Sequence, residues 1–362
     1  MQKYLTLIGL VILASCDKPD SNPTNSFDRG PMLENMGQSV IIPSYDAAVF
    51  AADELVNATA AFVLQSDSAN LTLLQTKFSE AYLAFQDVSS YEFGPAQTVA
   101  LRGNLNTYPS DTVKIENAIA LGSWDFDQLQ FADGKGFPAI DVLLFGQSTS
   151  ETLRLFHSDS NAMTRKDFLQ EVSEQIQSLL NDVATSWSPN GDNYLAVFTN
   201  NKGTDVGSGT GMLVNALNKH FERYLRDGKI GIPVGVRSLG IALPEKCEAY
   251  NSGVSLALAV KNMHAIERMY NGNNLNNSSG IGLDDNQIGI GASDLDNAIQ
   301  QQIAVSLAAL EGLSDPLSEN IINDQAQVEA AYAELQKLIV LFKVDMPSRL
   351  GVLITYQDND GD

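Results

Sequence analysis

SANLTLLQTKFSEAYLAFQDV, residues 68–88, indicates the fold class of this 362-residue chain. Its apolar side chains recur three and four residues apart, at Leu71, Leu74, Phe78, Ala81, Phe85 and Val88. An α-helix has about 3.6 residues per turn, so this spacing places them on one stripe. Ser68, a residue type that favours the N-cap, precedes the stripe. The stretch therefore predicts an amphipathic helix that packs against other helices.

The same periodicity recurs elsewhere, at Leu295, Ile299, Ile303, Leu307 and Leu310 behind Ser293, and at Val328, Ala331, Leu335, Leu338 and Phe342. Further helices are expected at residues 44–64, 165–184 and 211–226, and in a long run opened by Pro244. Only residues 352–356 have the composition of a short extended piece. The predicted fold is all-α, with two antiparallel four-helix bundles at residues 44–190 and 200–356.

Two polar segments interrupt this pattern. Residues 187–206 are rich in Pro, Asn and Gly and mark the break between the bundles. Residues 271–292 are rich in Asn and Gly, and we expect an exposed insertion there rather than a binding loop. The last residues, 357–362, form an acidic tail without the downstream Glu of a calcium loop.

The charge balance excludes some partners. The chain has 22 Lys and Arg against 44 Asp and Glu, a formal net charge of −22. Such a field repels phosphate backbones and the sequence offers no basic patch, so nucleic acid is not an expected partner. Cations or basic partners are favoured instead.

The N-terminus indicates export. Lys3 precedes a short apolar run, residues 5–13, which is too short for a permanent membrane span. Residues 1–15 therefore read as a signal peptide. The following LASC at 13–16 resembles the lipobox of bacterial lipoproteins, which implies a lipid on Cys16 and a place in the bacterial cell envelope, on the periplasmic or outer-membrane side. The alternative is an ordinary secretory signal with a chance cysteine. Residues 16–43 are expected to form a flexible tether, and Cys247 then has no disulfide partner.

GFPAIDVLLFG, residues 136–146, is the most distinctive stretch. Pro138 suits the start of a short helix, Asp141 falls in its early turns, and Gly146 ends it. The stretch resembles the hallmark segment of the imelysin-like family of bacterial envelope proteins. Other segments extend the resemblance over most of the chain, namely NLNTYP at 104–109, KIGIP at 229–233, PEKCEAY at 244–250 and PSRLGV at 347–352.

The resemblance implies a duplicated four-helix-bundle fold, an envelope location, a link to iron uptake and a metallopeptidase label. The family's proposed metal motif is GxHxxE. Here Gly136 and Asp141 occupy its first and last positions, and Pro138 stands where the histidine would be. A zinc-bound water held by His and Glu is therefore in doubt at this segment.

NMHAIERMYNG, residues 262–272, aligns with 136–146 without gaps and contains an HxxE pair, His264 and Glu267. Residues three apart share a helix face, so both could approach one cation. A chance similarity is the alternative. If the two segments are counterparts, then Asp141, His264 and Glu267 would share a divalent metal, iron or zinc, because imidazole suits transition metals.

Other candidates carry weaker signals. The acids Asp125, Asp127 and Asp133 are expected to face the groove between the bundles, and His157 and His220 lack ligand spacing. The glycine-rich residues 207–211 could cradle an anion, but a flexible helix entry is the simpler interpretation.

Three functions are compatible with these features. The favoured one is a non-catalytic metal- or ligand-binding accessory protein of iron uptake, with envelope iron-transport components as partners. The second is a metal-dependent peptidase, which would need about three ligands and a general base. The third is a structural or adhesion bundle.

We predict that Cys16→Ser yields an exported protein that fractionates without detergent, because no second apolar run approaches the length of a membrane span. Membrane fractionation after a high-salt wash measures this. Retention of the variant in the detergent-requiring fraction would contradict the lipid anchor.

Overall fold

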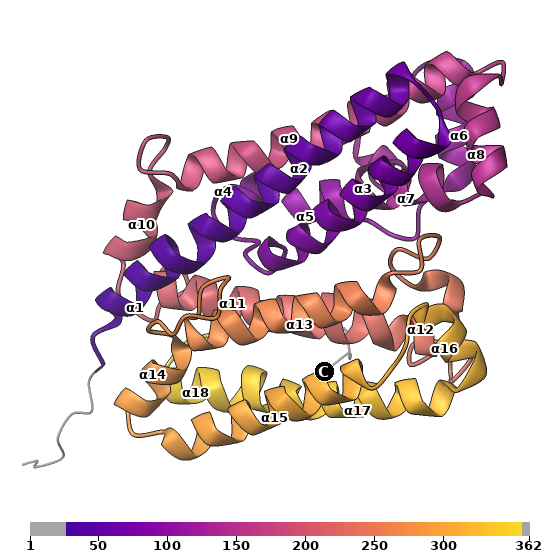
Figure 1. Ribbon diagram of the computed structural model, residues 1–362. Helices are drawn as coiled ribbons and strands as arrows, with labels where there is room; N and C mark the ends of the chain where they lie inside the picture. Colours follow the sequence, from indigo (N-terminus) through magenta and orange to yellow (C-terminus); the bar gives the residue numbers. More distant parts are fainter. Residues whose placement is uncertain (1–26, 357–362) are drawn as a thin grey trace, which may run out of the picture.

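The computed structural model describes residues 27–356, so Cys16, the predicted signal peptide and the acidic tail lie outside the described part. Within residues 27–356 the regular elements are all helices and none is a strand, which confirms the all-α fold class. The long helices form two layers that lie one above the other in Figure 1.

The first layer comes from the N-terminal half. It contains α2 (Ile42–Leu64), which packs lengthwise against both α3 (Ser68–Val88) and α9 (Ala162–Trp187). Short helices fill the space beside them: α4 (Pro95–Thr98), α5 (Leu101–Leu105), α6 (Thr112–Leu121), the 3₁₀ turn η2 (Leu129–Gly134), α7 (Gly136–Phe145), α8 (Thr149–His157) and α10 (Tyr194–Asn200).

The second layer comes from the C-terminal half. Its long helices are α13 (Ser255–Asn271), α15 (Ser293–Glu311) and α17 (Gln325–Val340), together with α11 (Gly209–His220), which continues as an 11-residue π-helix, η3 (Phe221–Gly231). The short elements are α12 (Ile232–Val234), η4 (Pro244–Lys246), α14 (Leu283–Gly289), α16 (Leu317–Asn323), the π-helix η5 (Leu341–Asp345) and α18 (Met346–Leu350).

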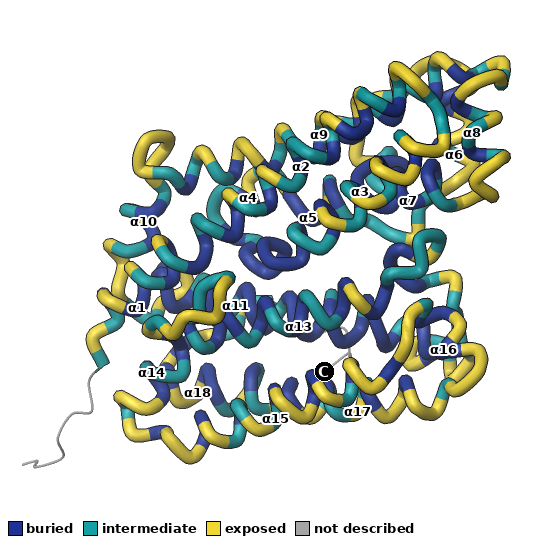
Figure 2. The backbone as a smooth tube through the Cα atoms, in the orientation of Figure 1, coloured by how far each residue is buried: buried dark blue, intermediate teal, exposed yellow. Residues whose placement is uncertain are grey.

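The periodic stripes identified in the sequence are buried. All six stripe residues of α3, from Leu71 to Val88, are at most 2% exposed, and the stripes of α15 and α17 are buried as well. The helix begins at Ser68, but its N-cap is Asp67, whose carboxylate accepts a hydrogen bond from the Asn70 amide. Figure 2 shows buried residues along the inner sides of both layers and exposed residues along the outer sides. The two layers meet where α13 packs against α3. That the halves are duplicated four-helix bundles remains a prediction.

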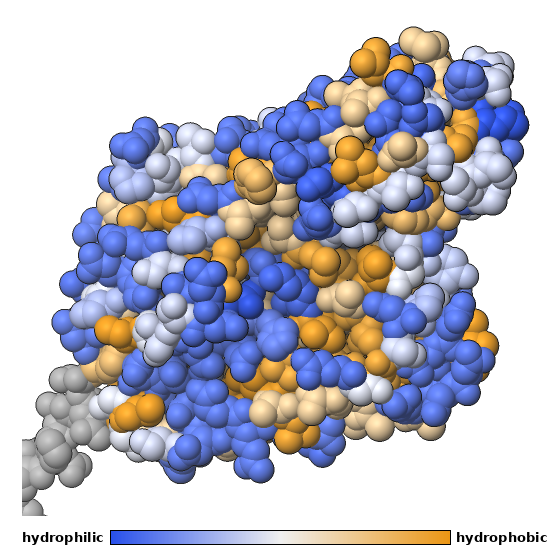
Figure 3. All heavy atoms as spheres, in the orientation of Figure 1, coloured by the Kyte–Doolittle hydropathy of each residue, from blue (hydrophilic) through white to orange (hydrophobic). Residues whose placement is uncertain are grey.

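The face of the molecule in Figure 3 is mostly hydrophilic. Hydrophilic residues cover most of the face shown in Figure 3, and hydrophobic residues form smaller groups among them.

The predicted tether is wrong over its second half. Residues 29–41 form α1 (Arg29–Asn35) and the π-helix η1 (Met36–Ile41), which run directly into α2. Met32, Leu33, Met36 and Ile41 are each 0% exposed. The polar composition concealed this apolar face. The stretch Arg29–Leu64 is also long and apolar enough to cross a membrane by length and composition alone, and a third of its most apolar window is buried in the structure.

Three other segments differ from expectation. Pro244 opens a single 3₁₀ turn, and the helix begins only at Ser255 because residues 247–254 form turns. The break at 187–206 contains α10. The segment 271–292 is not simply an exposed insertion, since it contains α14 with buried Leu283, Asn286 and Gln287.

We predict that Leu33→Ala lowers the free energy of unfolding by about 2–5 kcal/mol, because a fully buried leucine leaves a cavity. Urea unfolding measures this. Glu34→Ala is the control, since Glu34 is exposed on the same helix and its loss should change stability by less than about 0.5 kcal/mol. Equal effects of the two substitutions would place α1 outside the core.

Candidate functional site

Helix α7 lies at the centre of the candidate site. It packs against α3, α5, α6, α8 and α9, and eight of its residues are buried. Gly136 begins the helix at φ +70°, and a Cβ there would lie 2.3 Å from the Leu105 carbonyl oxygen. Only glycine fits this position, because it combines a left-handed backbone with a close approach to another chain segment.

Asp141 links the two layers. Its Oδ2 accepts hydrogen bonds from the backbone N–H of Asn251 at 3.0 Å and from Asn251 Nδ2 at 2.9 Å, and its Oδ1 accepts one from the Ser252 N–H at 3.0 Å. The side chain is 2% exposed. Burial raises the pKa of Asp141, and the hydrogen bonds from Ser252 and Asn251 oppose that rise. The carboxylate thus holds the 249–253 turns against α7.

A buried ion pair lies beside this contact. Lys229 of η3 pairs with Glu248, and their side chains are 3% and 1% exposed. The other Glu248 oxygen accepts a hydrogen bond from Asn106 Nδ2 at 2.7 Å, and Asn106 Oδ1 accepts one from the Tyr82 hydroxyl at 2.5 Å. Burial lowers the pKa of Lys229, while Glu248 opposes that shift. The segments NLNTYP, KIGIP and PEKCEAY therefore meet at one place.

A second network crosses the layers at Arg102. Its Nη1 donates to the Ser89 carbonyl at 3.0 Å and lies 3.2 Å from His220 Nδ1, and its guanidinium stacks 3.6 Å over the Tyr224 ring. Arginine can only donate, so His220 Nδ1 accepts and its Nε2 carries the proton. That Nε2 lies 2.9 Å from Asn262 Oδ1. Burial lowers the pKa of His220 well below its usual value, and the positive charge of Arg102 lowers it further. The ring is therefore neutral.

Two adjoining cavities open beside α7. The larger has a volume of about 550 Å³ and lies among α6, α7, α8 and α9, and the smaller, about 240 Å³, includes Asp141, Glu245 and Cys247 in its wall. Both are lined by Thr112, Val142 and Asn251. We call the two together the α7 cleft.

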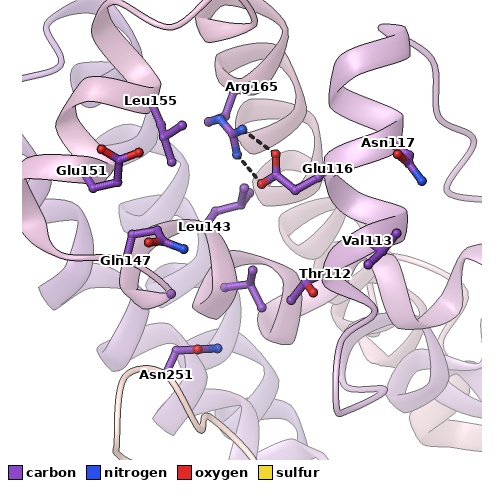
Figure 4. Close-up of a pocket in the computed structure, with 12 residues that line it drawn as sticks. Thr112, Val113, Glu116, Asn117, Leu143, Gln147, Glu151, Leu155, Arg165 and Asn251 are labelled. Carbon is purple, nitrogen blue, oxygen red and sulfur yellow. Dashed lines mark hydrogen bonds and ion pairs between the residues drawn. The ribbon is translucent and has the colours of Figure 1, made fainter.

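The larger cavity has a mixed lining (Figure 4). Arg165 donates to Glu116 through Nη1 at 2.8 Å and Nη2 at 2.6 Å, so that the pair is bidentate. Glu151 also lines the cavity, and its hydrogen bonds with Arg154 lower its pKa. Amides, one hydroxyl, paired charges and aliphatic side chains face the same space, a lining suited to a polar ligand with apolar parts.

Comparisons with known proteins agree with this architecture. The family model described as Imelysin (Peptidase_M75) matches residues 41–342. The chain belongs to the imelysin family. A curated relative, iron-regulated protein A of Synechococcus elongatus, is 23% identical over 347 residues, which are 91% of this chain and 88% of the relative.

Two solved structures share the fold. A protein assigned as an iron-regulated protein A precursor from Parabacteroides distasonis has a TM-score of 0.74 and 18% identity, covering 89% of this chain and 95% of its own. An imelysin-like protein from Psychrobacter arcticum has a TM-score of 0.68 and 16% identity, covering 90% and 96%. At these identities the likeness shows the fold.

The residues at the imelysin motif do not fit a metal. Pro138 has no donor atom for a metal, and both oxygens of Asp141 already accept hydrogen bonds from Asn251 and Ser252. His264 Nδ1 lies 3.1 Å from Glu267 Oε2, and its Nε2 lies 3.6 Å from Glu311 Oε1. Neither residue contacts Asp141, so the predicted three-residue site does not assemble. No group of three or more His, Cys, Asp or Glu that could hold a metal was found in residues 27–356.

The other acidic residues named in the sequence analysis make local contacts. Asp125 accepts hydrogen bonds from the Asp127 N–H and Gln128 Nε2 within its own exposed loop, and Asp133 pairs with Lys114. The three acids line neither cavity of the α7 cleft.

Of the two unassigned histidines, His157 is exposed and His220 is buried. Burial raises the pKa of the Cys247 thiol to about 12, which keeps it protonated.

The 207–211 segment is a helix entry, as favoured, but a buried one. Ser208 Oγ accepts a hydrogen bond from the Gly211 N–H, and a Cβ on Gly211 would lie 2.1 Å from the Asp205 carbonyl oxygen. The segment is therefore closely packed rather than flexible.

We predict that Asp141→Asn lowers the free energy of unfolding by about 1–3 kcal/mol, because its amide nitrogen would face the N–H donors that the carboxylate now satisfies. Urea unfolding of the variant measures this. Asp127→Asn, an exposed aspartate of the same layer, should change stability by less than about 0.5 kcal/mol. A stable Asp141→Asn protein would show that the turn is held by other contacts.

Proposed function

We propose that this imelysin-family chain is a lipid-anchored accessory protein of iron uptake in the bacterial envelope, and that it binds its ligand in the α7 cleft without hydrolysing peptides. The link to iron comes from the relatives, which are described as iron-regulated. Anchoring rests on the LASC segment ending at Cys16.

One observation supports the proposal that the chain does not hydrolyse peptides. The motif histidine is replaced by Pro138, and both oxygens of the Asp141 carboxylate accept hydrogen bonds from Asn251 and Ser252. A metallopeptidase needs ligands that leave an open metal position and a base that activates water. At this segment the Asp141 side chain instead accepts hydrogen bonds that link the two layers.

The α7 cleft supplies a binding place. Its larger cavity, about 550 Å³, falls in the size range of small-molecule sites. The Arg165–Glu116 pair gives it one fixed polar feature, and Val142, Leu143 and Leu155 give it an apolar wall. Such a lining favours iron in a small organic complex, rather than the bare ion, as the ligand of an iron-uptake protein.

The test uses the full Cys16→Ser chain, incubated with radioactive iron(III) citrate and passed through a desalting column. We expect retained iron in the parent protein and at least a tenfold loss in Thr112→Trp, because Thr112 lines both cavities and an indole there would obstruct the space at their junction. Thr76→Trp is the control, since Thr76 is exposed on α3 and lines neither cavity of the α7 cleft.

A protease assay on casein, with and without added zinc and iron(II), runs beside it. Metal-stimulated cleavage that copurifies with the chain would contradict the non-catalytic role. Iron retention that is equal in the parent and both tryptophan variants would contradict binding in the cleft.

A further inference from the structure

Arg165 is the only cation among the described residues that line the α7 cleft. It extends from α9, and its side chain is 4% exposed. Its Nη1 and Nη2 atoms donate to the carboxylate of Glu116 on α6, and its Nε atom is buried without a partner among residues 27–356. A buried charge that has no partner is costly. Arg165 therefore requires an anion at this place in the cavity wall.

The two members of this ion pair differ in their surroundings. The side chain of Glu116 is 51% exposed, whereas that of Arg165 is buried. Figure 4 shows the pair at the cavity, with the carboxylate of Glu116 directed at the guanidinium. A carboxylate released from the pair would regain water at little cost, but the guanidinium could not. The anion is therefore the exchangeable member of the pair.

We propose that the α7 cleft selects ligands that carry a free carboxylate, and that this carboxylate takes the place of Glu116 on Arg165. This inference rests on the proposed role of the cleft as a binding site. The bidentate contact with Glu116 shows that the guanidinium accepts a carboxylate in this position, at 2.8 Å and 2.6 Å. A neutral ligand cannot displace Glu116, because Arg165 would then be left buried without an anion.

The other charged residues of the lining favour a complexed carboxylate over a free polyanion. They are all acids, namely Glu116 and Glu151 in the larger cavity and Asp141 and Glu245 in the smaller one. These charges repel a polyanion and attract a positive centre. A ligand that presents one carboxylate to Arg165 and carries a metal cation elsewhere satisfies both conditions. The free acid should therefore bind more weakly than its iron(III) complex.

The test measures binding of radioactive citrate, without metal, to the full Cys16→Ser chain by equilibrium dialysis. We expect Glu116→Gln to bind citrate about tenfold more tightly than the parent, a difference of about 1.4 kcal/mol, because the internal competitor for Arg165 is weakened. Arg165→Lys should bind at least tenfold more weakly, since an ammonium group keeps the charge but cannot make the two parallel hydrogen bonds. A purely structural ion pair would not give effects of opposite sign.

Glu151→Gln is the matched control. It removes the same charge from the same cavity, but Glu151 pairs with Arg154 and not with Arg165. Its citrate affinity should stay within about threefold of the parent value, as for an exposed charge. Trimethyl citrate has the same skeleton without free carboxylates, and it should not displace the label. Inorganic phosphate should displace it less readily than citrate does. These comparisons remain decisive if Arg165→Lys fails to fold.

Three results would overturn the carboxylate exchange. These are equal citrate affinities of the parent and Glu116→Gln, equal gains in Glu116→Gln and Glu151→Gln, or displacement of the label by trimethyl citrate or phosphate as readily as by citrate. In a chain that retains iron and loses it in Thr112→Trp, such a result overturns the exchange alone. Citrate affinities in the expected order, in a chain that retains no iron, would support the exchange and contradict the role in iron uptake.

Discussion

The rest of the structure depends on the buried polar contact between the two helical layers. Apolar side chains pack against one another in many registers, but hydrogen bonds require particular atoms to meet. Asp141 accepts hydrogen bonds from the turn at Asn251 and Ser252, and Arg102 contacts His220 and Tyr224. Both sets of contacts can form only when the two layers are in one relative position. Asp87 adds a third link, with ion pairs to Arg268 and Lys261. Removing one partner of such a buried pair is far costlier than the pair's net gain, so these contacts fix the register.

The same contact explains how α7 positions the cleft. Its start is fixed by Gly136 against the Leu105 carbonyl, and its middle is fixed by Asp141 against the opposite layer. Val142 and the backbone near Asn251 are then held at the cavity wall. A helix held at both its start and its middle gives a preorganised wall, which lowers the entropy that a ligand must lose on binding.

Asp141 occupies the last position of the GxHxxE motif and makes a structural contact there. The segment forms a short buried helix of the first layer, and its acidic residue contacts the turn at Asn251 and Ser252. With Pro138 in place of histidine, the carboxylate has no neighbouring imidazole at this segment and accepts three hydrogen bonds from the turn instead. The chain therefore keeps the imelysin fold, and at this position Asp141 makes a contact between the layers.

The sequence by itself determined the local features: the helical class, the stripes of α3, α15 and α17, and the His264–Glu267 pair, because residues three and four apart on a helix are neighbours whatever surrounds them. It also showed that the segments around Asn106, Lys229 and Glu248 were distinctive, but it assigned them no contacts. Only the tertiary structure decided those, since Asp141 meets Asn251 across 110 positions and Arg102 meets His220 across 118. It likewise showed that Met32, Leu33, Met36 and Ile41 belong to the core and that the amides of α14 are buried. Burial and long-range pairing depend on how whole helices pack, and a local pattern of residue types does not contain that information.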